Sequence, residues 1–593
     1  MRKKLLLLLF LLCCLLAIFL YKNNQSTPFP EKKETADITD IHTDKARYKP
    51  GEPVRFEASL ADSFGSSLTI TYMKLNEKIQ TQTVNAENGK AVWSWQPPED
   101  DFTGYLVKVQ SEKEAKTIAV DVSSSWSVFP RYGFLSEFGD VSEKEAASVL
   151  KKLNRHHING IQFYDWHYEH HQPLKMTENG PSPEWQDIAG RNVQLGTVIN
   201  YIKISHEYGM NAMAYNLLYG AFRGAEEDGV KKEWMLFKDP HRKEPDFHPL
   251  PDDWKSDVIL ANANDRSWQD YLIGRQKQVY QALDFDGWHI DQLGDRGALY
   301  DSQGKSVHLA DGFDEFIHYA KSQSPDKKMV MNAVNQYGQE NISSAPADFL
   351  YTEVWDPYKS YGDLKKIIDD NRTMSDSRMN TVLAAYMNYD LSDKKGTFNP
   401  PGIFLTNSVI FASGGAHLEL GEHMLSKEYF PHHHLKSDHE LSEGLIRYYD
   451  FLTAYQTLLR SRDLKETENE IESRSDVKIS SVPEKGAVWS FAKQNRHQKM
   501  LHFINFTEAD SMEWRDSSGS QPEPALRKNV SIRLSEPRKI KSIWMASPDA
   551  KEGIPQTVSF TQKGNNVIMT LPSLKYWSMA VIEYEKQQNG HLQ

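Results

Sequence analysis

The stretch that decides the fold is residues 285–291, Phe-Asp-Gly-Trp-His-Ile-Asp. It is a short, mostly apolar run that follows a helical pattern over residues 268–283 and ends in an acid. Buried strands of parallel sheets have such short, continuous apolar runs, because helices cover both faces of the sheet. The acid at its end also indicates function, because active sites of barrel enzymes lie at the carboxyl ends of the strands.

The same rhythm recurs on both sides of this stretch, from about residue 128 to 460. The expected strands are 131–135, 160–164, 211–215, 258–261, 287–291, 329–333, 349–354, 381–386 and 417–420. Helical patterns lie between them, for example at 143–153, 198–207, 268–283 and 312–322. Strand–helix alternation of this length predicts a parallel sheet, and about eight repeats predict a (β/α)8 TIM barrel. Nine candidates are one too many, and 258–261 can be assigned to a loop.

The flanks of this region have a different pattern. Larger apolar residues stand at every second position in 54–58, 68–72 and 118–122, which predicts an immunoglobulin-like β-sandwich. Alternation returns over 470–586, and it predicts a C-terminal antiparallel β-sandwich. The predicted division is a signal peptide or signal-anchor at 1–22, a linker at 23–35, an immunoglobulin-like domain at 36–125, the catalytic barrel at 126–465 and the C-terminal sandwich at 466–593.

The N-terminus predicts export. Arg2, Lys3 and Lys4 precede an apolar run over residues 5–20, and polar residues follow it. This pattern is typical of a secretory signal or a signal-anchor, and its charge bias places the rest of the chain outside the cell. The only two cysteines, Cys13 and Cys14, lie in this run. A lipoprotein is therefore an alternative, and the exported part can form no disulfide. We expect an extracellular protein, secreted or tethered to the outer face of the membrane.

Charge and motifs exclude several classes of function. The chain has 69 Lys and Arg against 81 Asp and Glu, a formal charge of −12. Nucleic acid is an unsuitable partner, because phosphate binding needs clustered cations. Neither a G-x-G-x-x-G turn nor a G-x-S-x-G elbow is present. Residues 432–434 are three consecutive histidines without H-x-x-x-H spacing, so we expect no metal and no organic cofactor in the site. A structural Ca²⁺ in an acid-rich loop such as 226–228 is an open alternative.

Two strand ends carry the acids that a glycosidase needs. Asp291 ends the run at 287–291, and Glu353 occupies a similar place in 349–354. Both would point into one barrel mouth. One carboxylate attacks or stabilises the anomeric carbon while the other protonates the leaving oxygen. The donor must keep its proton near neutral pH, so its pKa must be raised. The alternative for each acid alone is a helix cap or a salt bridge.

Other strand ends combine aromatic rings with amides and carboxylates. Hydroxyl-rich ligands are recognised by such residues, through ring stacking and paired hydrogen bonds. Asp165 and Asn216 are the strongest of these candidates, although a structural role is an alternative for each one. The predicted substrate-binding residues are Tyr164, Asp165, Trp166, Asn216, His289, Asn335, Trp355, Asn388 and Glu419.

Four motifs resemble one known family. They are QFYDWH at 162–167 with HH at 170–171, DGWHIDQLGD at 286–295, YTEVW at 351–355, and HLELGE at 417–422 with EYFP at 428–431. In this order they resemble glycoside hydrolase family 66, which contains dextranases and cycloisomaltooligosaccharide glucanotransferases. The resemblance covers roughly residues 36–586. It implies a retaining endo-glycosidase acting on α-1,6-glucan, with Asp291 as the nucleophile and Glu353 as the acid/base.

Two alternatives stay open. The cyclising members carry an inserted carbohydrate-binding module, and the interval from 354 to 416 has only ordinary βα lengths, which favours hydrolysis over cyclisation or transfer. The second alternative is a surface glucan-binding protein on an inactive barrel. The presence of both Asp291 and Glu353 argues against it.

Overall fold

The computed structural model describes residues 36–61, 67–468 and 470–585. The predicted signal segment at 1–22 and the linker at 23–35 lie outside these ranges. Within them, none of the helices combines the length and the apolar character needed to cross a bilayer.

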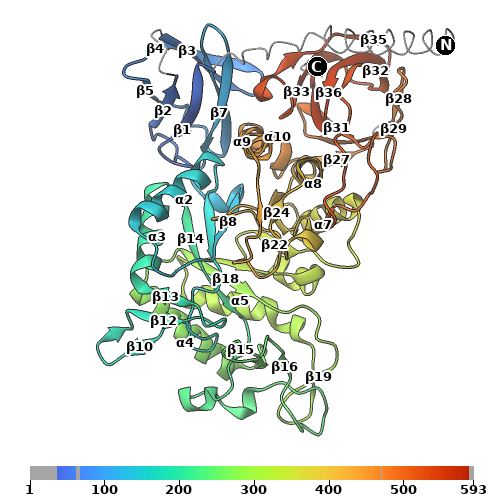
Figure 1. Cartoon of the computed structure of the whole chain (residues 1–593). Helices are drawn as coiled ribbons and strands as arrows, with labels where there is room; N and C mark the ends of the chain where they lie inside the picture. The colour runs from blue at the N-terminus through green and yellow to red at the C-terminus, as the bar shows by residue number, and fades with distance from the viewer. Residues whose placement is uncertain (1–35, 62–66, 469, 586–593) are drawn as a thin grey trace, which may run out of the picture.

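Eight parallel strands form the centre of the described chain, and we refer to them as the central strands (Figure 1). They are β8 (Tyr132–Leu135), β9 (Gly160–Phe163), β14 (Asn211–Leu217), β18 (Gly287–Asp291), β21 (Lys328–Met331), β22 (Leu350–Glu353), β23 (Thr381–Ala384) and β25 (Ala416–His417). Neighbours in the chain are neighbours in space. A parallel bridge between Asn332 and Tyr351 joins β21 to β22. The amide of Phe134 donates to the carbonyl of Leu420 at 3.0 Å, so the last strand returns to the first.

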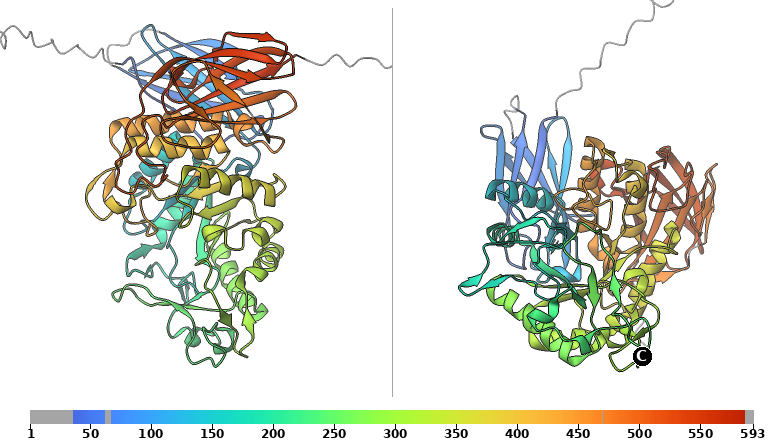
Figure 2. Two further views of the ribbon diagram at one scale, coloured as in Figure 1. Left: turned by 90° about the vertical axis from the view of Figure 1, so that its right-hand side faces the viewer. Right: turned by 60° about the horizontal axis from the view of Figure 1, so that its bottom comes forward.

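Helices lie outside the central strands (Figure 2). The described helices are α2 (Glu143–Arg155), α3 (Leu195–Glu207), α4 (Arg266–Ala282), α5 (Phe313–Gln323), α6 (Gln339–Ser344), α7 (Tyr361–Met374), α8 (Pro400–Ser413), α9 (His439–Ala454) and α10 (Gln456–Arg460). Local chemistry sets where they begin. Ser142 starts α2 with a capping box, in which its hydroxyl accepts from the Glu145 amide and the Glu145 carboxylate accepts from the Ser142 amide.

Alternate residues of the central strands point inward and form one apolar cluster. The cluster includes Tyr132, Phe134, Met213, Val330, Tyr351, Val382, Ala384 and Tyr386. Because strand side chains alternate with a period of two, residues between these face outward, toward the helices. This alternation decides which residue at each strand end reaches the mouth.

Two antiparallel sheets precede the central strands. One consists of β1 (Ile38–Thr43), β2 (Val54–Leu60) and β5 (Lys90–Trp95), and the other of β4 (Glu77–Asn85), β3 (Ser67–Lys74), β6 (Thr103–Gln110) and β7 (Ala115–Val122). Alternate residues of both sheets pack into one core. Within it Phe56 stacks on Trp93 at 5.0 Å between ring centroids, and Tyr72 stacks on Trp95 at 4.3 Å.

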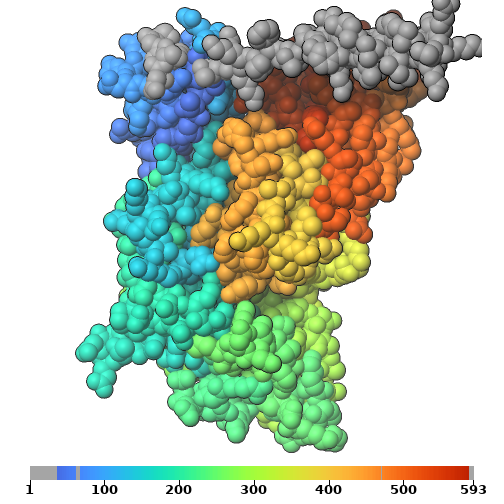
Figure 3. Space-filling model, viewed as in Figure 1, coloured from blue at the N-terminus to red at the C-terminus, as the bar shows by residue number. Residues whose placement is uncertain are grey.

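Two more antiparallel sheets follow the central strands and share a core of their own. The larger sheet holds β27 (Lys465–Thr467), β29 (Ile479–Ser480), β30 (Val488–Gln494), β31 (Gln498–Asn505), β33 (Ile540–Ala546), β34 (Gln556–Thr557) and β37 (Trp577–Tyr584). The smaller holds β28 (Ile471–Ser473), β32 (Arg527–Ser535), β35 (Phe560–Lys563) and β36 (Asn566–Leu574). The N-terminal and C-terminal sheets occupy the same end of the molecule, and α9 lies between them (Figures 1 and 3).

The structure confirms the predicted mixed α/β class. The bounds of the expected strands lie within three residues of those observed, and β14 runs two residues past the predicted end. The surplus candidate is β17 (Val258–Leu260), which pairs antiparallel with β15 (Gly220–Ala221) and β16 (Phe247–His248). It is therefore not a central strand, in agreement with its assignment to a loop.

Candidate active site

A pocket of about 600 Å³ opens at the carboxyl ends of the central strands. Its lining includes Tyr164, Asp165, His289, Asp291, Glu353 and Trp355. All six were predicted from the sequence as site residues. A groove of about 700 Å³ in the C-terminal sheets is lined without a single aromatic ring, so it lacks the stacking surface that sugars require.

Asp291 is the last residue of β18, and two neutral donors hold its carboxyl group. The hydroxyl of Tyr215 on β14 donates to Oδ2 at 2.7 Å. Asn332, just past β21, donates from Nδ2 to Oδ1 at 2.8 Å. Both donors favour the ionised form, which is the form a nucleophile needs.

Glu353 is the last residue of β22 and shares one of these donors. Asn332 Nδ2 also donates to Glu353 Oε2 at 3.0 Å. The hydroxyl of Tyr386 donates to Oε1 at 2.9 Å. The backbone amide of Glu353 donates to Asn332 Oδ1 at 3.2 Å, which fixes the amide's orientation between the two acids.

The shared donor limits the separation of the two acids. Asp291 Oδ1 and Glu353 Oε2 cannot be more than about 5.8 Å apart, the sum of their distances to Asn332 Nδ2. Retaining glycosidases place their carboxyl groups about 5–5.5 Å apart, and inverting enzymes about 6.5–9.5 Å apart. The upper limit on the distance between the two carboxyl oxygens agrees with the retaining geometry.

The environment separates the proton affinities of the two acids. Burial raises the pKa of Asp291, while the hydrogen bonds from Tyr215 and Asn332 act in the opposite direction. Burial and then the negative charge of Asp291 raise the pKa of Glu353 to about 7. One proton near neutral pH therefore resides on Glu353. A charged nucleophile beside a protonated donor is the starting state of a retaining reaction.

The backbone conformation of Asp165 places its side chain in the pocket. Its φ of 50° lies in the left-handed region, which Asp tolerates better than most residues. The turn directs toward the pocket a side chain that regular alternation would point outward. Burial, followed by the charge of Asp187, raises its pKa to about 8, while Arg191 lowers it.

Five of the predicted binding residues do not line the pocket. Each is buried or bonded behind it instead. Trp166 donates to the Tyr215 carbonyl, Asn216 bonds His170, Asn335 accepts from the Trp355 amide, Asn388 donates to Asp516, and Glu419 accepts from Asn407 and Tyr449. For four of them the reason is the direction of the side chain. Asn216 and Glu419 face outward by alternation, Trp166 follows the turn at Asp165 with φ of 50°, and Asn388 itself has a φ of 52°. These residues support the site without reaching its surface.

The sequence reasoning missed three residues that touch the carboxyl pair, namely Tyr215, Asn332 and Tyr386. The signal that could have found them is alternation. Tyr215 and Tyr386 continue the inward series of Met213 and Ala384, and Asn332 continues that of Val330. The register of β14 against β18 is a second signal, because it places Tyr215 beside His289 and Leu217 beside Asp291.

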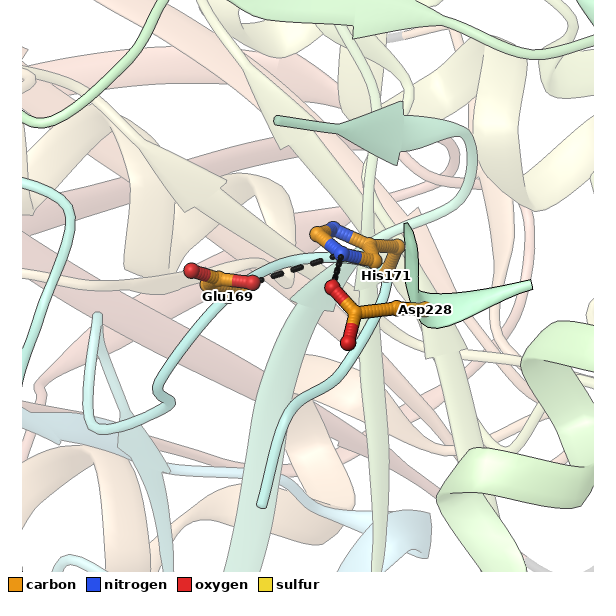
Figure 4. A group of neighbouring side chains, drawn as sticks. All are labelled: Glu169, His171 and Asp228. Carbon is orange, nitrogen blue, oxygen red and sulfur yellow. Dashed lines mark hydrogen bonds and ion pairs between the residues drawn. The ribbon is translucent and has the colours of Figure 1, made fainter. Parts of the chain in front are cut away.

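A group of possible metal ligands lies near the pocket rim (Figure 4). His171 Nε2 is 3.1 Å from Asp228 Oδ2 and 3.3 Å from Glu169 Oε2. The backbone amide of Phe222 donates to His171 Nδ1 at 3.3 Å, which places the ring proton on Nε2. Metal-bound histidines instead donate their second N–H to an acceptor. The three side chains are therefore better explained as hydrogen bonds that join two loops than as a metal centre.

A strand-end carboxyl pair inside a sugar-sized pocket places the protein among the glycoside hydrolases. A model of glycosyl hydrolase family 66 matches residues 43–581, and the chain belongs to this family. The predicted family is confirmed, and with it the class of enzyme.

Named relatives are of two kinds. A cycloisomaltooligosaccharide glucanotransferase from Niallia circulans is 27% identical, with 91% of this chain aligned to 72% of that one. A dextranase from Streptococcus salivarius is 24% identical, with 81% of this chain aligned to 67% of that one. A crystal structure of a Paenibacillus sp. cycloisomaltooligosaccharide glucanotransferase, complexed with cycloisomaltoheptaose, superposes with a TM-score of 0.88. It shares 26% identity and covers 92% of this chain and 99% of its own.

Proposed function

We propose that the protein is a retaining endo-glycosidase that cleaves α-1,6-glucosidic bonds of dextran or isomaltooligosaccharides. The observation that carries the proposal is the carboxyl pair bridged by Asn332, with one acid ionised and the other protonated near neutral pH. Asp291 attacks the anomeric carbon and Glu353 protonates the leaving oxygen. Glu353 then accepts a proton from the water that releases the sugar. The substrate class comes from the relatives, which are a dextranase and glucanotransferases named for isomaltooligosaccharides.

Transfer to a sugar acceptor is the second candidate. Both relatives with the highest identities among those named here, at 27% and 26%, are cycloisomaltooligosaccharide glucanotransferases. The two reactions share the covalent intermediate and differ only in whether water or a hydroxyl of a sugar attacks it. A non-catalytic glucan-binding protein would have no need for two acids held on one donor.

We also propose that the central strands and their helices form a (β/α)8 barrel at 126–465. An immunoglobulin-like sandwich at 36–125 and a C-terminal sandwich at 466–593 would flank it. The closed series of parallel strands and the separate apolar cores support this division. The basic residues before the apolar run at 5–20 support export, with a secreted or membrane-tethered protein outside the cell.

One incubation separates these functions. Purified protein is incubated with dextran, pullulan and starch, and the products are sized and tested for cyclic forms. Linear isomaltooligosaccharides from dextran support hydrolysis, and cyclic products support transfer. Absence of any released sugar from all three would overturn both enzymatic proposals.

A further inference from the structure

One of the predicted binding residues, His289, lies at the floor of the pocket, and its two ring nitrogens have different surroundings. It precedes Asp291 by two positions on β18, so both side chains point into the interior of the central strands. The residue is only 1% exposed, yet it lines the pocket. Its ring centroid is 6.0 Å from that of Tyr215, which stacks on it, and 4.7 Å from that of Tyr351, which packs edge-to-face. His289 is therefore held in place one layer deeper than Asp291.

The first nitrogen, Nδ1, faces a tyrosine on the far side of the interior. The hydroxyl oxygen of Tyr132, on β8, lies 3.3 Å from Nδ1. Two strands, β14 and β9, separate β18 from β8, so this contact crosses the interior. Tyr132 is fully buried, and Nδ1 is the only partner of its hydroxyl among the described residues. A buried hydroxyl without an acceptor is costly, so we assign the proton of this bond to Tyr132.

The donation from Tyr132 decides which ring nitrogen of His289 carries the proton. Burial lowers the pKa of His289 to about 3, so the ring is neutral near neutral pH and has a single N–H. Since Nδ1 accepts from Tyr132, that N–H is at Nε2. Nε2 bonds to none of the described residues, and it is not sealed from the pocket. The floor of the pocket thus presents one N–H donor that no described protein group occupies.

We propose that Tyr132 is a positioning residue, which holds the His289 proton on Nε2 for donation to a hydroxyl of the glucose unit that bonds to Asp291. The inference rests on the proposed hydrolysis and adds a residue that acts from outside the pocket lining. Hydrogen bonds to the reacting sugar contribute most when they strengthen in the transition state. A donor with a fixed proton should therefore raise kcat more than it lowers KM.

Tyr132→Phe tests the proposal, because it removes the hydroxyl and keeps the ring. We expect kcat on dextran to fall about tenfold while KM changes less than about twofold, because the ring proton is no longer held on Nε2. Tyr455→Phe is the matched control. Tyr455 is equally buried, and its hydroxyl donates to the Gly553 carbonyl at 2.8 Å, away from the pocket. This variant should lower the melting temperature but leave kcat unchanged.

Substitutions of His289 show whether Tyr132 acts through this ring. A glutamine amide reaches the position of Nε2, whereas an asparagine amide reaches only that of Nδ1. His289→Gln should therefore keep kcat within about tenfold of wild type, and His289→Asn should lose about 10²-fold. In the His289→Gln background Tyr132→Phe should have no further effect, because an amide has no tautomer to fix.

Thermal melts establish that each variant is folded. Wild-type kcat and KM in folded Tyr132→Phe would overturn the inference, as would equal losses from His289→Gln and His289→Asn. A loss from Tyr132→Phe that persists in the His289→Gln background would also overturn it, because Tyr132 would then act by another route. Failure of the wild-type enzyme to cleave any α-1,6-glucan is a different result, and it would overturn the proposed function itself.

Discussion

Asn332 holds Asp291 and Glu353 close together. Its single amide nitrogen donates to both Asp291 and Glu353, and its oxygen is held by the Glu353 amide. Tyr215 adds a second donor to Asp291. Because the ionised Asp291 lies so close, the proton stays on Glu353, whose pKa is about 7. Burial and the charge of Asp291 thus raise the pKa of Glu353, while the hydrogen bonds from Asn332 and Tyr386 oppose the rise. We propose that this difference sets Asp291 as the nucleophile and Glu353 as the acid.

Asp291→Asn and Glu353→Gln should each remove nearly all activity on α-1,6-glucan. The first removes the nucleophile and the second removes the transferable proton, while both keep the shape of the side chain. We expect losses of at least about 10³-fold in kcat/KM, measured by reducing-sugar release. Circular dichroism should show folded proteins. Activity within tenfold of wild type in either variant would refute its assignment.

Glu353→Gln should also stabilise the protein above neutral pH. The folded state raises the pKa of Glu353 from its ordinary 4.5 to about 7, so it binds the proton more tightly than the unfolded chain does. Wild-type stability is therefore lost as pH rises from about 4.5 to about 7, by at most about 3 kcal/mol. Gln cannot ionise and avoids this loss. Melting temperatures at pH 4 and pH 8 measure it, and an equal difference between the proteins at both values would contradict it.

At the scale of elements, a loop from the C-terminal sheets supports the acid's side of the pocket. Arg515 lies between β31 and β32, and its Nη2 donates to the Val354 carbonyl at 2.9 Å, next to Glu353. Its guanidinium lies 4.8 Å from the Trp355 ring and 5.1 Å from the Tyr389 ring. The C-terminal sheets thus reach the site that the central strands carry.

Arg515→Ala should lower kcat/KM by about 10–100-fold, because small displacements of a catalytic group have effects of this size. Arg515→Lys should recover part of the loss, since it keeps the charge but not the planar fork. Exposed Arg496 supplies the control, and Arg496→Ala should leave activity unchanged. If Arg515 had only a general structural role, Arg515→Ala would lower the melting temperature without changing kcat/KM of the folded protein.

Most elements could be predicted from the sequence because each strand is a short apolar run bounded by helical periodicity. Asp291 and Glu353 were found because both end such runs. Asn388 and Asp165 depend on backbone turns with positive φ, which the residue pattern does not reveal. The contact between the Trp254 and Tyr429 rings joins positions far apart in the chain, so no local pattern could predict it. The inward direction of Tyr215 and Asn332 was predictable from alternation and was overlooked.

At the scale of the molecule, a buried ion pair joins the N-terminal sheets to the central strands. Asp121 at the end of β7 accepts from Arg131, just before β8, at 2.6 Å, and both side chains are fully buried. Gln456 of α10 also donates to Asp121, at 2.9 Å. Three parts of the chain therefore meet at one carboxylate.

Asp121→Ala should destabilise the protein by about 3–5 kcal/mol, because it leaves the Arg131 charge buried without its partner. The change is measured as a shift of the denaturant midpoint. Asp100→Ala is the control, since its pair with Lys74 is exposed and should contribute no more than about 1 kcal/mol. Equal shifts in the two variants would show that burial of the pair has no special effect.

The most direct test of the carboxyl pair is the configuration of the first-formed product. Dextran or a defined isomaltooligosaccharide is cleaved in an NMR tube, and the anomeric proton of the new reducing end is followed before mutarotation. Two successive displacements at Asp291 predict the α anomer. The β anomer as the first product would mean a single displacement by water, and it would contradict the nucleophile assigned to Asp291.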